Sequence, residues 1–328
     1  MQVGKLTSDQ LKSIIFSTLN KKRKEVIVRP NIGEDCAILD FGEYVCVMST
    51  DPITGTSEEI GKLAVHITCN DIAASGVEPL GLMLTIMAPV GTKEEEIKKI
   101  MLDASNEAAK LNVDIIGGHT EITSAVNRIV LSSTGVGKEK KDKIMQRKSL
   151  KPSDILVLTK GAGIEGTGII CFEKYQELKQ LYGKEIVEEG KKLLDSISVV
   201  KEGIIAGKVG VSCMHDVTEG GVLGAIWEMC ELYKLGCTIY KEKIYIHKST
   251  KLVCDHYKID PLRLISSGSM IIGVSKDKLD LLKSEFEKEN IDYFIIGEFT
   301  KEKEIILKEG KQQTIVLQPQ SDELYKVL

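Results

Sequence analysis

Residues 31–40 read NIGEDCAILD and place two adjacent carboxylates, Glu34 and Asp35, directly before an apolar run. The pattern returns ten residues later, where the apolar residues 45–48 lead through Ser-Thr into Asp51. Taken alone, each acid is more simply a turn or cap residue. Several acids gathered at one place would instead suit a hard cation such as Mg²⁺, which bridges carboxylates to substrate phosphates. The rest of the sequence decides between these two interpretations.

The composition is that of an ordinary globular protein and excludes several classes of partner. The chain has 328 residues, enough for two cores, with 42% hydrophobic and 28% charged residues. A net charge of −4 gives no electrostatic case for binding nucleic acid or an acidic membrane. No apolar run approaches the ~20 residues of a membrane span. The first ten residues, MQVGKLTSDQ, contain no signal-peptide core.

The eight cysteines are scattered along the chain without a CxxC pair. This spacing argues against a zinc site and against a disulfide framework. It is typical of a reducing compartment, where isolated cysteines act as small buried hydrophobic residues. We therefore expect a cytoplasmic protein that has no membrane or nucleic-acid partner.

Alternating strand-like and helical segments predict an α/β protein. Short apolar strands are interleaved with long helices, and no short-period repeat is present. The clearest expectations in the first half are strands near 36–40 and 44–50, a helix from Ser57 to Gly76, and a helix opened by a capping box of Thr92 and Glu95.

A basic hydrophilic stretch marks the best domain boundary. It reads KEKKDKIMQRKSLKPSD from residue 138, and the strand-like DILVLTK follows it. Such a charge run is more simply a solvated linker than a binding patch. The sequence therefore predicts two domains, 1–150 and 151–328.

A polar pair, Asn70 and Asp71, interrupts the apolar helix of the first half. Burying an unpaired aspartate is unfavourable, so Asp71 needs a partner. That partner is either a neighbouring backbone group or a metal ion, and position alone does not separate the two.

A glycine pair follows the apolar residues 115 and 116, and polar side chains come directly after it. Paired glycines let a backbone approach a ligand closely. A lone histidine at such a place is more often structural than catalytic. The candidates in this segment are Gly117, Gly118, His119, Thr120 and Glu121.

The segment HDVTEGG, residues 215–221, joins a predicted strand to a predicted helix. Backbone N–H groups at a helix start favour phosphate, which would involve Gly220 and Gly221. The carboxylate of Asp216 would repel a phosphate unless it held a cation between them. On the simpler interpretation Asp216 is a helix cap.

The stretch GAGIEG, residues 161–166, matches the GxGxxG pattern of dinucleotide-binding proteins and follows a predicted strand. That fold requires a short helix, a second strand and an acid at its end. A long polar helical region follows here instead. NAD binding is therefore the less favoured interpretation.

Five motifs in order resemble the aminoimidazole ribonucleotide (AIR) synthetase superfamily: GEDCAILD, VMSTD, LAVHITCNDIAASGVEPLG, IIGGHTEIT and HDVTEGGVLGAIWEM. That superfamily includes AIR synthetase, formylglycinamidine ribonucleotide synthetase, thiamine-monophosphate kinase, selenophosphate synthetase and HypE. The resemblance covers residues 31 to about 275 and leans toward the HypE-like branch.

The resemblance implies that acids from several motifs converge on Mg²⁺ ions that hold the phosphates of ATP. Glu34 stands where the family usually has aspartate. His119 stands where the kinase branch has a metal-binding aspartate, and Glu121 is the candidate to compensate for it. His119 and Asp216 are the catalytic candidates. The implied metal ligands are Glu34, Asp35, Asp51, Asp71 and Asp216, and the implied ATP contacts are Ser49, Thr50, Asn70, Gly117, Gly118, Thr120, Gly220 and Gly221.

The resemblance also implies a two-domain fold and an ATP-dependent activity. The N-terminal domain would dimerise, its sheet forming a barrel with that of its mate, and the C-terminal domain would have a mixed sheet flanked by helices. The chemistry would phosphorylate or activate an oxygen of a small-molecule or protein-bound acceptor, as in hydrogenase or metal-cofactor maturation. HypE dehydrates a carboxamide on its own C-terminal cysteine, whereas the last cysteine here is Cys254, so that reaction is not expected.

Two other functions stay open on the sequence. One is a nucleotide-binding maturation partner without turnover, because His119 departs from the kinase pattern. The other is the NAD-dependent oxidoreductase suggested by residues 161–166.

Overall fold

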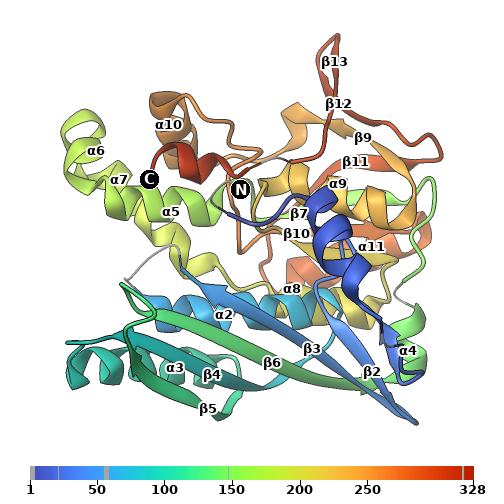
Figure 1. Cartoon of the computed structure of the whole chain (residues 1–328). Helices are drawn as coiled ribbons and strands as arrows, with labels where there is room; N and C mark the ends of the chain where they lie inside the picture. Colours follow the sequence, from blue (N-terminus) through green and yellow to red (C-terminus); the bar gives the residue numbers. More distant parts are fainter. Residues whose placement is uncertain (1–3, 21, 55–58, 147, 320) are drawn as a thin grey trace.

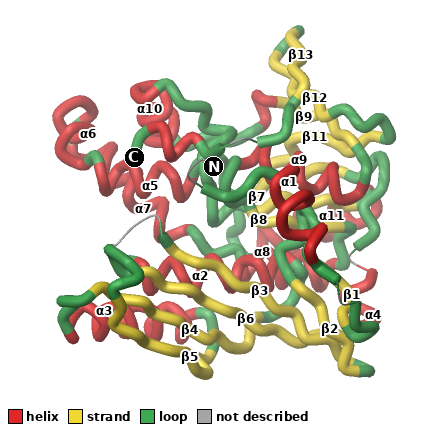
Figure 2. Tube along the Cα trace, viewed as in Figure 1, coloured by secondary structure: helices red, strands yellow, loops and turns green. Residues whose placement is uncertain are grey.

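The computed structural model describes residues 4–20, 22–54, 59–146, 148–319 and 321–328. Its strands form two sheets in separate parts of the molecule, one from each half of the chain (Figures 1 and 2). The architecture is therefore the expected mixture of helices and strands in two layered parts. Division into independent domains at residues 150 and 151 stays a prediction.

The first sheet has six strands in the order β1-β2-β3-β6-β4-β5, so β5 is an edge strand. Neighbouring strands are antiparallel except β4 and β5, which are parallel. Side chains alternate along β3, where Val45, Val47 and Ser49 are buried and the residues between them are partly exposed. The strands are β1 (Val26–Val28), β2 (Ala37–Phe41), β3 (Tyr44–Ile53), β4 (Pro79–Pro89), β5 (Asp114–Thr123) and β6 (Val130–Lys140).

Helix α2 (Ile60–Ala74) lies between the first sheet and helix α8 (Val200–Val209) of the second half (Figure 1). It is apolar on almost every side because it is covered on both sides. Helix α8 approaches closely because Gly203 has no side chain where it meets the carbonyl oxygen of Ala73. This contact fixes the acid-bearing end of α2 against the second half.

The predicted end of α2 agrees with the structure, but its predicted start does not, because Glu59 has a left-handed φ of 54° and the helix begins at Ile60. Ser57 lies outside the described residues, and Gly76, with φ of 72°, follows the end of the helix. The left-handed conformation of Gly76 is the usual way to stop a helix.

Helix α3 (Glu94–Lys110) begins one residue later than the predicted capping box. The N–H of Lys93 donates to the Glu96 carboxylate at 2.9 Å. The hydroxyl of Thr92 instead donates to the last carbonyl of β4, at 2.8 Å. The pairing of Thr92 with Glu95 was therefore wrong, because the turn that leaves β4 already uses the threonine hydroxyl.

Helices α2 and α3 pack against one face of the first sheet and against each other. Among the described residues, the other face presents the apolar side chains of Met48, Met83 and Val136, which are partly or largely exposed. The edge strand β5 continues this face and is exposed along nearly its whole length. The sheet therefore has one buried face and one that is open in the single chain.

The second sheet has seven strands in the order β13-β12-β9-β11-β7-β10-β8. It is mixed, since β12 and β9 are parallel and the other neighbours are antiparallel. Helix α9 packs on one face, and helices α8 and α11 pack on the other. The strands are β7 (Ile155–Thr159), β8 (Cys213–Asp216), β9 (Gly236–Tyr240), β10 (Met270–Val274), β11 (Tyr293–Thr300), β12 (Ile305–Glu309) and β13 (Gln312–Ile315).

The remaining helices are mostly short and surround these layers (Figure 1). In the part of the chain that is described, none is long and apolar enough to cross a membrane. They are α1 (Ser8–Gln10), η1 (Leu11–Ile15), η2 (Phe16–Thr18), α4 (Lys141–Gln146), α5 (Ile164–Glu173), α6 (Tyr175–Tyr182), α7 (Lys184–Lys192), η3 (Leu193–Ser196), α9 (Gly221–Tyr233), η4 (Lys241–Lys243), α10 (Lys248–Tyr257), α11 (Lys276–Lys288) and η5 (Glu323–Lys326).

Candidate functional site

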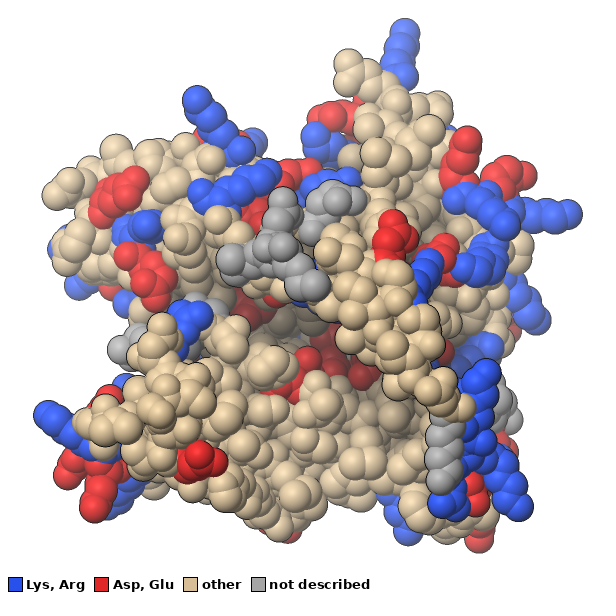
Figure 3. Space-filling model, in the orientation of Figure 1, with Lys and Arg blue, Asp and Glu red and all other residues tan. Residues whose placement is uncertain are grey.

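Four aspartates from four separate elements gather between the two halves. Asp35 precedes β2, Asp51 lies on β3, Asp71 lies on α2, and Asp216 ends β8. Figure 3 shows acidic side chains inside the hollow between the two parts of the molecule. The first three acids come from the first half of the chain and the fourth from the second half. Both halves are therefore needed to assemble the group.

Ser49 joins two of these acids on the inner face of the first sheet. Its hydroxyl donates a short hydrogen bond to Asp71 and lies 3.5 Å from Oδ2 of Asp51. Burial raises the pKa of Asp71 well above its usual value, and the charges of Asp216, Asp51 and Asp35 raise it further. The carboxylates are thus close enough to repel one another strongly.

His215 lies beside three acids, Asp35, Asp216 and Glu228. Oxygen or nitrogen atoms of Asp35, His215 and Asp216 all lie within 4.8 Å of one another. The Nε2 atom of His215 is 3.5 Å from Asp35 Oδ1 and 3.1 Å from Glu228 Oε2. The Nδ1 atom faces the carbonyl oxygen of Asp216 at 2.7 Å. The histidine therefore holds acids from the two halves together.

The charges around His215 set its protonation. Burial lowers its pKa, but Asp35, Glu228 and Asp216 outweigh burial and raise the pKa to about 10. Burial raises the pKa of Glu228, but the close contact with His215 and the positive charge of Lys5 outweigh it and lower the pKa to about 2. At neutral pH the pair is therefore an ion pair, histidinium with carboxylate.

Asp216 has unfilled binding capacity. Its side chain is buried, and neither carboxylate oxygen has a hydrogen-bond partner among the described residues. Burial and the charge of Asp35 raise its pKa to about 8. An acid kept in this state needs either a proton or a cation, because burying an unpaired charge is very unfavourable. A divalent cation bound by Asp216 and its neighbours would satisfy it.

The donor set fits a hard cation. Carboxylate oxygens such as those of Asp35, Asp51, Asp71 and Asp216 are the ligands that Mg²⁺ prefers. Among the described residues, one cluster brings possible ligand atoms within 4.8 Å of one another, and it consists of Asp35, His215 and Asp216, without a cysteine. These four carboxylates and Glu228 face only two cationic side chains, His215 and Lys5, in the contacts described. The residues present therefore fit one or more divalent cations.

Three residues of this group escaped the sequence analysis as site residues: Lys5, His215 and Glu228. His215 lies directly before Asp216, in a motif that was already under scrutiny. Glu228 is an acid within the apolar run of α9, which is the signal that singled out Asp71 in α2. Lys5 reaches Glu228 with its ammonium group at 3.5 Å from a distant part of the chain, so no local pattern reveals it.

The structure does not bring residues 117–121 to the acids. They lie within the edge strand β5, whereas Asp51 lies on β3, and strands β6 and β4 run between the two. Three strand spacings amount to about 14 Å. His119 is level with Thr85 on the open face of the sheet, whereas Asp51 is on the covered face. The polar residues after the glycines stay in the sheet, because β5 continues beside β4 as far as Thr123.

His119 and Glu121 face each other on this open strand, with 3.7 Å between Nε2 and Oε2. Both side chains are largely exposed. Gly117, Gly118 and Thr120 are exposed on the same strand. In a single chain these five residues are therefore separate from the acidic group.

Thr50 and Asn70 have other contacts than the expected ones. The Thr50 hydroxyl lies on the open face, 2.9 Å from the hydroxyl of Thr134. The Asn70 amide donates to the carbonyl of Ile197 at 2.7 Å and accepts the N–H of Val199 at 2.8 Å. Asn70 therefore ties α2 to the segment before α8.

The two glycine amides of HDVTEGG are already used by the protein. The N–H of Gly220 donates to Oδ2 of Asp322 at 2.7 Å, and the N–H of Gly221 donates to the carbonyl of Thr218 at 3.0 Å. The structure thus gives both amides to protein groups rather than to a phosphate. The carboxylate of Asp322, near the C-terminus, accepts the hydrogen bond at this helix start instead.

Glu34 points away from the other acids. Its carboxylate forms a close ion pair with the ammonium group of Lys148. The side chains of these two neighbouring residues thus leave the turn in different directions, Asp35 toward His215 and Glu34 toward Lys148.

The GAGIEG stretch does not form a dinucleotide cradle. The N–H of Ile164 donates to the hydroxyl of Ser266 at 3.0 Å, and that of Gly166 donates to the carbonyl of Ile265 at 2.9 Å. The preceding strand, β7, is antiparallel to both of its neighbours, whereas a dinucleotide-binding sheet is parallel at this point. The NAD interpretation therefore loses its structural basis.

Comparisons with known proteins give matches along most of the chain. The family model of the AIR synthase related protein N-terminal domain matches residues 33–138, and the model of its C-terminal domain matches residues 151–309. A putative hydrogenase expression/formation protein of Methanocaldococcus jannaschii is 27% identical, over 99% of this chain and 97% of the relative. The carbamoyl dehydratase HypE of Bradyrhizobium diazoefficiens is 27% identical, over 75% of this chain and 71% of the relative.

Solved structures show the same architecture. A crystal structure of a HypE–HypF complex superposes with a TM-score of 0.71 and 26% identity, over 88% of this chain and 94% of the other. A crystal structure of HypE in complex with ATP superposes with a TM-score of 0.69, over 98% of this chain and 94% of the other. At 18% identity the second likeness shows the fold alone.

Proposed function

Because the chain belongs to the AIR synthase related protein family, we propose that it binds ATP with Mg²⁺ and uses it to activate an oxygen atom of an acceptor. The observation that carries this proposal is the convergence of Asp35, Asp71 and Asp216 from both halves, with neither oxygen of Asp216 hydrogen-bonded among the described residues. Such a site suits a nucleotide triphosphate that arrives with its cations.

Each part of the group would have a distinct task. Asp35, Asp51, Asp71 and Asp216 would hold the cations, with the hydroxyl of Ser49 orienting Asp71. Bound Mg²⁺ supplies positive charge that offsets the negative charge of the phosphates. The histidinium of His215, fixed by Glu228, keeps the acids of the two halves together. The protein would thus act by positioning and charge rather than by covalent chemistry.

The relatives supply the biological setting of the proposal. Two are named for hydrogenase formation or for HypE, and HypE has been crystallised both with HypF and with ATP. For this chain we propose a role in the maturation of hydrogenase or a related metal cofactor, with a small-molecule or protein-bound acceptor. The free cysteines of the described chain support a reducing, cytoplasmic setting.

The proposal extends to a homodimer formed through the open face of the first sheet. That face carries apolar side chains such as Met83, and the exposed strand β5 adjoins it. Dimer formation would bury this surface and bring His119 of β5 to the interface. Any contribution of residues 117–121 to ATP binding would then depend on the second copy.

Titration calorimetry with ATP tests the proposal directly. We expect binding with Mg²⁺ and none in EDTA. Asp71→Asn should weaken the Mg²⁺-dependent binding at least tenfold, about 1.4 kcal/mol, because it removes one charged ligand. Asp280→Asn, which changes an exposed acid on α11, is the matched control. An unchanged affinity in Asp71→Asn would contradict the assignment of the site.

A parallel assay of ADP release separates an enzyme from a binding partner. Binding of ATP with Mg²⁺ but no ADP release with any acceptor would favour the nucleotide-binding partner without turnover. Acceleration by one acceptor would identify the substrate as well as the activity.

A further inference from the structure

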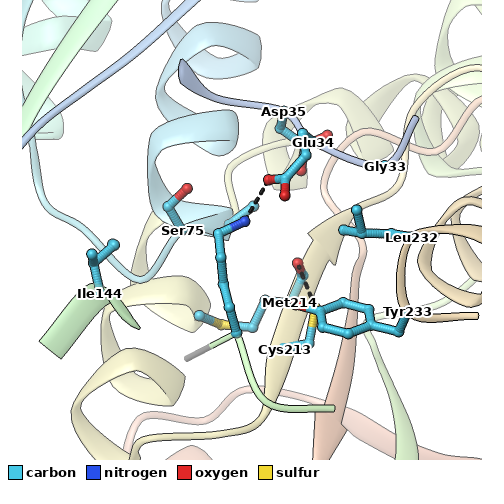
Figure 4. A pocket seen from close by; sticks show the side chains of 11 residues that line it. Gly33, Glu34, Asp35, Ser75, Ile144, Cys213, Met214, Leu232 and Tyr233 are labelled. Atoms are coloured by element: carbon cyan, nitrogen blue, oxygen red, sulfur yellow. Dashed lines mark hydrogen bonds and ion pairs between the residues drawn. The ribbon is translucent and has the colours of Figure 1, made fainter. Parts of the chain in front are cut away.

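A pocket that contains an ion pair lies where the two halves of the chain meet, which we call the seam. It is on the other side of the 33–35 turn from the acidic group. Figure 4 shows a pocket lined from the first half by residues 33–35, by the end of α2 and by Ile144, and from the second half by β8 and the end of α9. The ion pair of Glu34 and Lys148 spans it. The proposed function leaves this pair without a role.

Glu34 belongs to a turn that is fixed against the second half. Gly33 has φ of 78°, and a Cβ atom there would lie 2.7 Å from the backbone carbonyl oxygen of Glu228. The turn therefore reaches α9 only because residue 33 is glycine. The side chain of Glu34 then extends into the pocket, while that of Asp35 faces His215.

Lys148 is anchored to the strand that carries the rest of the acidic group. The N–H of the next residue, Ser149, donates to the carbonyl of Ser212 at 3.0 Å, directly before β8. Leu150 is buried in the core of the second sheet. The backbone of Lys148 thus has a fixed place relative to His215 and Asp216.

The pair is largely shielded from water. The Glu34 side chain is 14% exposed and that of Lys148 is 27% exposed. Exposed ion pairs contribute little, whereas removal of one partner from a shielded pair leaves an uncompensated charge and is strongly unfavourable. The contact can therefore hold two parts of the chain in place.

We propose that Glu34 is a positioning residue, whose ion pair with Lys148 holds the 33–35 turn against β8 so that Asp35 stays beside His215 and Asp216. The inference rests on the proposed function, because Asp35 is taken as a cation ligand. It changes the expected role of Glu34, which the sequence assigned to the metal ion itself. Of the two adjacent carboxylates, Asp35 would then bind the cation and Glu34 would hold Asp35 in position.

The two roles of Glu34 predict opposite effects of Lys148→Met. If Glu34 is a direct ligand, removal of the competing ammonium group leaves cation binding unchanged or strengthens it. If Glu34 positions Asp35, both Lys148→Met and Glu34→Gln should raise the Mg²⁺ concentration for half-maximal binding of a non-hydrolysable ATP analogue at least fivefold. The double variant should need no more Mg²⁺ for half-maximal binding than the single variant that needs more of it. Lys148→Arg should bind like the wild type.

Calorimetric titrations of Mg²⁺ at a fixed concentration of the ATP analogue measure this quantity. Lys141→Met is the matched control, because Lys141 pairs with Asp40 in the same half and does not touch the turn. Weaker binding in both single variants supports the inference. A wild-type or stronger response in Lys148→Met overturns it.

A second readout needs neither nucleotide nor metal ion. Cys213 lines the pocket and is buried. If the contact between the two halves loosens, N-ethylmaleimide should alkylate Cys213 faster. Peptide mass spectrometry measures the rate of this alkylation. We expect at least a fivefold increase in Lys148→Met and Glu34→Gln, relative to Cys46 as the internal reference. Unchanged alkylation of Cys213 in both variants overturns the inference.

The two readouts keep the two proposals apart. If the wild type does not bind ATP with Mg²⁺, the proposed function fails, and the alkylation of Cys213 still decides whether the pair holds the seam. If the wild type binds but the variants do not differ from it in either readout, only the positioning role of Glu34 fails.

Discussion

At the scale of single residues, the arrangement rests on acids that are unfavourable in the absence of a ligand. Asp71 and Asp216 are buried near other carboxylates, and burial raises the pKa of both. Evolution of a core for stability alone would replace such residues with neutral ones. Their presence therefore indicates a function that requires charge at this place.

This reasoning predicts that Asp216→Asn stabilises the protein when no metal ion is present. The carboxyl of Asp216 has a pKa of 3.8 when exposed and about 8 in the fold, so the fold favours its protonated form. Wild-type stability should therefore fall as pH rises from about 4 to about 8, whereas asparagine stays neutral throughout. We expect a gain of roughly 2 kcal/mol at pH 8, less than the full shift implies because the neighbouring acids titrate together.

Thermal melts in EDTA at pH 5 and pH 8 check this prediction. The difference between Asp216→Asn and the wild type should be larger at pH 8 by several degrees. Added Mg²⁺ with ATP should stabilise the wild type more than the variant. A variant that melts below the wild type at pH 8 in EDTA would show that Asp216 has a stabilising contact of its own.

At the scale of elements, the strands and helices could be predicted from sequence more reliably than their contacts. The expected strands near 36–40 and 44–50 correspond to β2 and β3, since alternation and the turn at Gly42 mark them locally. The face to which His119 points depends on the pairing of β5 with β4, which no local pattern specifies. Glu34 and Gly220 likewise have partners more than a hundred residues away, at Lys148 and Asp322.

The contact between α2 and α8 should be sensitive to one methyl group. A Cβ atom at Gly203 would lie 2.2 Å from the carbonyl oxygen of Ala73, a backbone atom that cannot move aside easily. Gly203→Ala should therefore destabilise the protein by about 1–3 kcal/mol, as overpacking commonly does.

Urea unfolding curves measure this loss as a lower midpoint at an unchanged slope. Gly117→Ala is the control, because no atom lies within 4 Å of the position of its Cβ atom. Equal stability of the two variants would contradict the close contact between Gly203 of α8 and Ala73 of α2.

At the scale of the whole molecule, the open face of the first sheet is the feature that a single chain leaves unexplained. Met83 is 50% exposed on a strand whose other face is buried. Large apolar side chains on an open sheet face commonly mark an interface. The proposed homodimer would cover this face, and it would also account for the exposed segment that contains His119.

Light scattering with size-exclusion chromatography should show a dimer at micromolar concentration. Met83→Asp should convert it to a folded monomer, because the dimer would bury the new charge of the open face without a partner. Leu181→Asp, at an exposed apolar position on α6, should leave the dimer intact. A wild-type monomer at that concentration would contradict the proposed dimer.

The central claim is that acids from both halves of the chain jointly hold the divalent cations that accompany ATP. Electron paramagnetic resonance of Mn²⁺, used in place of Mg²⁺, tests this claim most directly in the presence of a non-hydrolysable ATP analogue. We predict that the wild type binds Mn²⁺ and that Asp71→Asn, from the first half, and Asp216→Asn, from the second, each weaken binding at least tenfold. Wild-type Mn²⁺ binding by a folded Asp216→Asn protein would contradict the claim.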